Sequence, residues 1–136
     1  MRSTLIDAGP LIALFDSSDQ YHLKAVRFIK EFEGRLCSTW PVMTEVCHML
    51  DYNTKAQLNF LLWVERGAIK LIELDTNHLS RIIELTRKFS DVPMDLADAS
   101  LMVAAEKLNC MEIASIDSDF YIYRTIRNKY LTNVFL

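Results

Sequence analysis

The stretch Ser3-Thr4-Leu5-Ile6-Asp7-Ala8-Gly9-Pro10 decides the fold of this chain. Residues 4–6 are apolar or β-favouring and predict a short buried strand, which ends at Asp7. The Gly-Pro pair at 9–10 then turns the chain, and proline suits the first position of the helix predicted to follow. Asp7 therefore lies where a strand gives way to a helix, which in an open parallel sheet is the edge that binds ligands. A helix-capping role is the alternative for Asp7, because such junctions favour it.

The same pattern recurs near the other end of the chain, where an apolar run over residues 111–116 leads into Asp117. Further strands are predicted over residues 35–39 and 68–74, with an edge strand over 134–136. Helical periodicity predicts helices that begin near residues 20, 40, 54, 75, 94 and 121 and end near residues 34, 52, 66, 89, 108 and 127. This alternation predicts an α/β protein, a three-layer α/β/α fold with a mainly parallel twisted sheet of four to five strands.

Length and composition indicate one ordinary globular domain over residues 1–136, with 51% hydrophobic residues and only three glycines and three prolines. No apolar run approaches the roughly 20 residues that span a bilayer, and we see no signal peptide, so we expect a cytoplasmic protein. Cys37, Cys47 and Cys110 are scattered, which is typical of reduced core thiols. The net charge of −3 excludes a protein that binds nucleic acid by charge alone.

Two helices carry acids beside their buried stripes. Glu45 borders the apolar face of the helix that opens at Trp40-Pro41, and the alternative is an ordinary salt-bridged edge residue. Asp95 and Asp98 lie three residues apart in the helix predicted over residues 94–108, so they project from neighbouring turns of one face. Asp95 suits the first turn, because the helix dipole stabilises a negative charge there. Asp98 is expected further along the helix, where the dipole no longer explains the presence of an acid.

On a parallel sheet, Asp7 and Asp117 fall at the same edge, and the helices that bear Glu45 and Asp98 begin near it, so all four carboxylates can converge on one cleft. Two carboxylates about 4 Å apart repel by about 4 kcal/mol at an effective dielectric constant near 20. Either some of them are protonated or a divalent cation is bound. Oxygen ligands of this number and kind select Mg²⁺ or Mn²⁺.

A carboxylate-held Mg²⁺ polarises a phosphate oxygen and lowers the pKa of a bound water, which is the equipment for hydrolysing a phosphodiester. No glycine-rich phosphate loop, Ser-His-Asp set or Cys-His pair competes with this interpretation. Two alternatives stay open. One is another Mg-dependent phosphohydrolase or phosphoacceptor domain on a similar sheet, for which Lys107 and Lys129 are poorly placed. The other is a non-catalytic interaction module that keeps the fold.

Four stretches, LIDAGPLIALFD (5–16), STWPVMTEVCHML (38–50), PMDLADASLMVAAEKL (93–108) and IASIDSDFYIYR (113–124), closely resemble the PIN-domain ribonucleases, in particular the VapC-type toxins of toxin–antitoxin pairs. The resemblance covers essentially the whole chain. Each stretch contributes one acid in an apolar setting, and specificity lies in the order and spacing of all four. The visible departure is Ser115, where the family often has threonine two residues before its fourth acid.

The resemblance implies a Mg²⁺- or Mn²⁺-dependent endoribonuclease acting on single-stranded RNA. Asp7, Asp98 and Asp117 would be the main metal ligands, and Glu45 would bind metal or position the attacking water. Asp95 would assist through water, the Ser115 hydroxyl would keep the hydrogen bond of the usual threonine, and Asp119 would support the site or lie at the surface.

The resemblance also implies partners. A homodimer is expected, held inactive by a cognate antitoxin that covers the acidic cleft. We expect dimer or antitoxin contacts at an exposed apolar surface around Phe60 and Trp63.

Overall fold

The protein is built on one sheet of five parallel strands, in the order β3-β2-β1-β4-β5. The computed structural model describes residues 1–136 without a gap. Its strands are β1 (Ser3–Ile6), β2 (Arg35–Ser38), β3 (Ile69–Leu71), β4 (Glu112–Ala114) and β5 (Thr132–Asn133). The predicted α/β class with a parallel sheet is confirmed.

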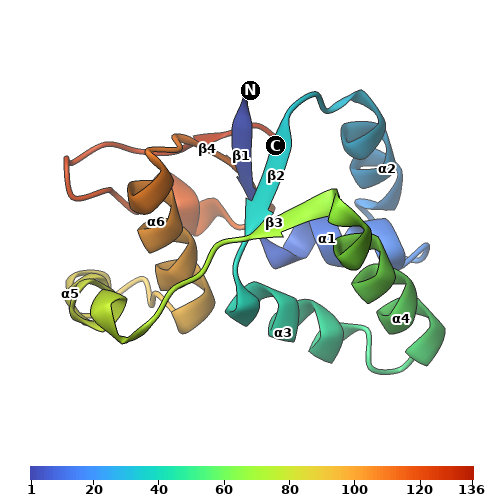
Figure 1. The fold of residues 1–136 in the computed structure, drawn as a ribbon, viewed down its shortest axis with the longest axis horizontal. Helices are drawn as coiled ribbons and strands as arrows, with labels where there is room; N and C mark the ends of the chain where they lie inside the picture. The colour runs from blue at the N-terminus through green and yellow to red at the C-terminus, as the bar shows by residue number, and fades with distance from the viewer.

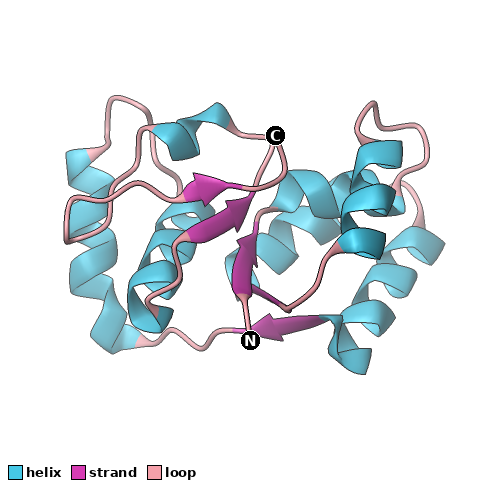
Figure 2. Cartoon of the chain, turned by 90° about the horizontal axis from the view of Figure 1, so that it is seen from above, coloured by secondary structure: helices cyan, strands magenta, loops and turns pink.

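Helices cover both faces of this sheet. They are α1 (Ala8–Phe15), α2 (His22–Glu31), α3 (Trp40–Met49), α4 (Thr54–Trp63), α5 (Leu79–Lys88) and α6 (Leu96–Leu108), with the short turns η1 (Val64–Ala68), η2 (Thr76–His78) and η3 (Ser118–Tyr121). In Figure 1, α5 and α6 lie on one side of the sheet and α1, α2 and α4 on the other. Figure 2 shows the strands running between these two layers, so the predicted three-layer arrangement is confirmed. None of the helices combines the length and apolar character needed to cross a bilayer.

The strand order creates a switch point beside β1. From β1 the chain builds β2 and β3 on one side, and it then crosses to build β4 and β5 on the other. In open parallel sheets, ligands bind outside the carboxyl ends of the strands where the order reverses. The carboxyl ends of the paired strands β1 and β4 are that place in this molecule.

Helix α6 is the most deeply buried helix, since every residue from Ala97 to Ala105 is buried. Two polar side chains lie within this run. The hydroxyls of Ser100 and Thr39 are hydrogen-bonded to each other at 2.6 Å, and the Ser100 hydroxyl donates to the carbonyl of Ala97 at 2.7 Å. The other buried polar residue is Asp98. The packing therefore accommodates polar groups on α6 only where they have partners close by.

The segment after β4 differs most from the prediction. No helix spans residues 121–127, because η3 ends at Tyr121 and an irregular loop follows. Tyr123 is completely buried in this loop, and its hydroxyl reaches across to Asp98 on α6. This long-range contact overrides the local helical preference.

The predicted edge strand near the C-terminus is present as β5, but it begins two residues earlier than the predicted range of 134–136. The side-chain amide of Asn133 donates to the carbonyl of Ser115 at 2.9 Å, and this hydrogen bond helps to set the register of β5 beside β4. Phe135 instead packs edge-on against Phe28 of α2, with ring centroids 5.6 Å apart. The apolar chain end thus joins the core rather than extending the sheet.

Two smaller corrections concern helices. Helix α6 begins at Leu96, so Asp95 is its N-cap and Asp98 lies in its first turn rather than further in. Phe60 is completely buried and packs edge-on against Phe15, so Phe60 itself is not part of the exposed apolar surface predicted around it. The exposed apolar side chains of α4 are Leu58, Leu61 and Leu62.

Candidate metal centre

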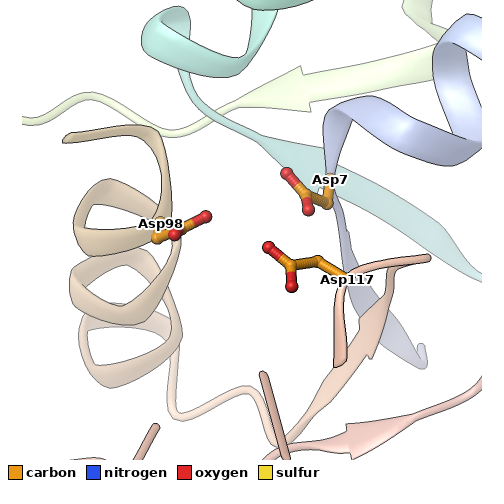
Figure 3. A group of neighbouring side chains, drawn as sticks. All are labelled: Asp7, Asp98 and Asp117. Carbon is orange, nitrogen blue, oxygen red and sulfur yellow. The ribbon is translucent and has the colours of Figure 1, made fainter. Parts of the chain in front are cut away.

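Three of the predicted acids come together at the switch point of the sheet. Asp7 directly follows β1, Asp117 comes three residues after the end of β4, and Asp98 lies in the first turn of α6. One carboxylate oxygen from each lies within 4.8 Å of those from the other two. Figure 3 shows the three side chains pointing toward a common centre.

Asp7 is held by hydrogen bonds to both of its carboxylate oxygens. Its Oδ1 accepts from the amide of Ala8 at 2.8 Å, which makes it the N-cap of α1, and its Oδ2 accepts from the Ser115 hydroxyl at 3.0 Å. The residue is only 7% exposed. The capping role and a place in the acidic cluster, which were alternatives from the sequence, therefore coexist.

Ser115 connects two of the three acids. Its hydroxyl donates to Asp7 and accepts from the amide of Asp117 at 2.9 Å. Asp117 in turn caps η3, because its Oδ1 accepts from the amide of Asp119 at 2.9 Å. The strand-end side of the cluster is thus fixed by short-range bonds within residues 115–119 and by one bond to Asp7.

Asp98 is fixed from two directions. Its amide donates to Oδ1 of Asp95 at 2.8 Å, so the backbone of the first turn of α6 is capped. Its Oδ2 accepts from the Tyr123 hydroxyl at 2.9 Å. Tyr123 is the site residue that sequence reasoning missed, because it is 25 residues from Asp98 and no local pattern marks the contact.

Burial makes the ionised forms of these acids costly. Burial, opposed by the hydrogen bonds from Ala8 and Ser115, raises the pKa of Asp7 to about 6. Burial and the charge of Asp95 raise the pKa of Asp98 to about 7. None of the ion pairs in the molecule includes Asp7, Asp98 or Asp117, so no lysine or arginine offsets their charge.

This donor set fits a divalent cation. Three carboxylates share one small volume without a protein cation, and each is oriented by hydrogen bonds from surrounding groups. Hard oxygen donors of this kind suit Mg²⁺ or Mn²⁺, and the charge of such an ion would favour the ionised carboxylates against the burial and mutual repulsion that raise their pKa values. Bound there, the ion would polarise a phosphate oxygen.

Glu45 and Asp95 lie outside the group of three. Glu45 is exposed on α3, and partial burial together with the charges of Asp95 and Asp117 raises its pKa. Asp95 is exposed and is used as the N-cap of α6. Both line an open cavity beside the cluster, whose other walls include Trp40 and Leu96. They border the centre without completing it.

Comparisons with known proteins give the family and the fold. The family model of the PIN domain matches residues 4–125. Among solved structures, the chain is similar to VapC20 of Mycobacterium tuberculosis, described as a sarcin-ricin loop cleaving toxin, with a TM-score of 0.80 and 15% sequence identity over 88% of this chain and 93% of that one. A search of curated proteins finds no match. At this identity the structural likeness shows a shared fold.

Proposed function

The chain belongs to the PIN domain family, and we propose that it is a metal-dependent endoribonuclease, the toxin of a VapBC-type toxin–antitoxin pair. It hydrolyses phosphodiester bonds of single-stranded or looped RNA. The observation that carries this proposal is the cluster of Asp7, Asp98 and Asp117 within 4.8 Å and without a protein cation.

In this proposal the three aspartates hold Mg²⁺ or Mn²⁺, which supplies charge stabilisation at the scissile phosphate. Glu45 stands beside the cluster with a raised pKa, which suits a group that orients the attacking water and accepts its proton. Ser115 keeps Asp7 and the backbone of Asp117 in place. Asp95 caps the start of α6 and assists the reaction through a water molecule.

Exposed aromatic rings on α3 and η3, the elements that carry Glu45 and follow Asp117, support an unpaired RNA substrate. Trp40 is the first residue of α3 and lines the same cavity as Glu45, and it is 63% exposed. Tyr121 ends η3, four residues after Asp117, and it is 52% exposed. Unpaired bases stack on such rings, whereas paired bases in an RNA helix are unavailable to them. The similar solved structure from Mycobacterium tuberculosis is described as a sarcin-ricin loop cleaving toxin, which supports a looped substrate.

We further propose a cytoplasmic homodimer that is controlled by a cognate antitoxin. The exposed leucines of α4, namely Leu58, Leu61 and Leu62, are the apolar surface that would be covered in the dimer. The acidic cluster would be covered by the antitoxin, for which a basic side chain is the complementary group. Light scattering of the wild type and of Leu61→Asp tests the dimer, since the variant should have half the molar mass if this surface is the interface.

The test of the proposed activity is cleavage of a mixed RNA pool with Mg²⁺, with Mn²⁺ and with a chelator. Wild type, Asp7→Asn and the exposed control Asp51→Asn are compared after identical purification. Cleavage that needs the metal, is lost in Asp7→Asn and persists in Asp51→Asn is the expected result. Cleavage that Asp7→Asn retains would overturn the proposal, because it would come from another site or from a contaminating nuclease.

A further inference from the structure

The hydroxyl of Tyr123 is the one side-chain donor that reaches the acidic cluster from the C-terminal loop. It donates to Oδ2 of Asp98 at 2.9 Å, and the residue is completely buried. Nothing in the loop requires a tyrosine for packing alone, because the ring of a phenylalanine fills the same volume. The hydroxyl is therefore the feature that needs an explanation.

The ring of Tyr123 is held between two other aromatic rings. Phe89, at the end of α5, packs edge-on against it with centroids 5.3 Å apart, and Phe120 of η3 does the same at 5.1 Å. Edge-to-face pairs at these distances are favourable and restrict the ring to one orientation. The hydroxyl thus approaches Asp98 from a fixed direction, set by the packing of Phe89 and Phe120 against the tyrosine ring.

This bond leaves the two oxygens of Asp98 in different situations. Oδ2 accepts from Tyr123 and faces the amide of Asp95 at the longer distance of 3.5 Å. Oδ1 accepts no hydrogen bond from the protein. In Figure 3 the carboxylate of Asp98 points toward Asp7 and Asp117. One oxygen is thereby used for orientation while the other remains available to a ligand.

The tyrosine hydroxyl has one proton, and it donates this proton to Oδ2 of Asp98. The hydrogen bond holds that oxygen, and with it the carboxylate of Asp98, in one orientation.

We propose that Tyr123 is a positioning residue of the metal centre, which turns Asp98 so that its free oxygen faces Asp7 and Asp117. The proposal rests on the metal site of the proposed function and adds a residue to it. Partners that orient a ligand from outside the coordination sphere typically contribute about 10- to 100-fold to metal affinity. The C-terminal loop is then part of the metal centre.

The test is Mn²⁺ affinity, measured from the electron paramagnetic resonance signal of free Mn²⁺ at pH 8. Tyr123→Phe removes only the hydroxyl, and Tyr130→Phe, in an exposed residue stacked on Arg124, is the matched control. We expect Tyr123→Phe to raise the Kd about 10-fold or more. Tyr130→Phe should leave it unchanged.

A double-mutant cycle separates positioning from a general structural effect. If Tyr123 acts through Asp98, Tyr123→Phe should have no further effect on the Kd in an Asp98→Asn background. An equal effect in both backgrounds, or a Kd for Tyr123→Phe within twofold of the wild type, would overturn the proposal.

A crystal structure of metal-free Tyr123→Phe gives a readout that does not depend on metal binding. The carboxylate of Asp98 should rotate or become disordered while Phe89 and Phe120 keep their places. An unmoved carboxylate would overturn the role of Tyr123. Absence of Mn²⁺ binding by the wild type would instead contradict the proposed function, so the two failures are distinguishable.

Discussion

The N-termini of α1 and α6 are built alike but differ in what their capping aspartates can do. Asp7 caps α1 by accepting from the amide of Ala8 at 2.8 Å, and Asp95 caps α6 by accepting from the amide of Asp98 at the same distance. Asp7 follows a buried strand and is 7% exposed, whereas Asp95 follows a turn and is exposed. The capping hydrogen bond that the two helices share depends only on the local sequence. The difference in burial arises because Asp7 follows a strand of the sheet, whereas Asp95 follows a turn.

This difference shows that capping does not prevent a carboxylate from joining a metal centre. In α1 the cap itself belongs to the cluster. In α6 the cap stays outside, and Asp98, three residues along, takes the place in the cluster. The two helices thus present acids to the same centre from different positions, α1 from its N-cap and α6 from its third residue. Substitutions at these positions can separate capping from metal binding.

The largest expected contrast is between Asp7→Asn and Asp95→Asn in metal-dependent RNA cleavage. Asparagine caps helices about as well as aspartate, so both variants should fold. Loss of a ligand should lower the cleavage rate by at least about 100-fold in Asp7→Asn, a larger loss than that of most supporting residues. Asp95→Asn should lose far less. Equal losses in initial-rate assays would remove the distinction between the two helix ends.

A second contrast concerns stabilisation by the metal. Mn²⁺ at about 100 times its Kd should raise the free energy of unfolding of the wild type by about 2.7 kcal/mol, because it binds only the folded state. Asp95→Asn should keep most of this increase, and Asp7→Asn should lose it. Urea denaturation with and without chelator measures the effect. An increase that survives in Asp7→Asn would place the ion elsewhere.

The raised pKa values predict how the metal-free protein responds to pH. Burial raises the pKa of Asp7 to about 6 and that of Asp98 to about 7, above the ordinary aspartate pKa of 3.8, so the folded state holds more protons than the unfolded state between about pH 4 and 7. Stability should therefore fall as pH rises through this window. For Asp7 the loss is of the order of 2 kcal/mol between pH 4 and 8.

The measurement is urea denaturation of chelator-treated protein across this pH range. The profile of Asp7→Asn should be flatter than that of the wild type, because the substituted side chain does not titrate. Profiles that run parallel would show that burial of Asp7 does not disfavour its charge.

The smallest expected effect isolates the cap of α6. Asp95→Ala removes the acceptor for the amide of Asp98 and should lower the free energy of unfolding by about 1 kcal/mol, whereas Asp95→Asn should cost only a few tenths. Thermal melts of both variants, read against the wild type, provide the comparison. Equal melting temperatures for the alanine and asparagine variants would mean that the cap contributes little to stability.

Much of this arrangement could be predicted from local sequence. Apolar runs that end in Asp7 and Asp117 predict parallel strands with acids at one edge, and the strands β1 and β4 pair as that pattern requires. The sequence does not fix the start of α6, because aspartate suits both the N-cap and the first turn. Only the hydrogen bond from the Asp98 amide to the Asp95 side chain shows that Asp95 is the N-cap.

Contacts between distant segments could not be predicted in this way. The loop that carries Tyr123 has a sequence compatible with a helix, and its irregular form depends on the bond to Asp98 and on packing against Phe89. Phe60 lies in α4 among leucines that are exposed, yet it is buried because α1 presents Phe15 to it. In each case, a partner far along the chain decides the outcome.

The most direct test of the metal centre is a crystal structure with Mn²⁺, using anomalous scattering to locate the ion. We predict one anomalous peak at a coordination distance of about 2 Å from oxygens of Asp7, Asp98 and Asp117, with the exposed cap Asp95 making no direct contact. A peak at another place, or none at an Mn²⁺ concentration that supports cleavage, would contradict the account of the three aspartates as the metal ligands.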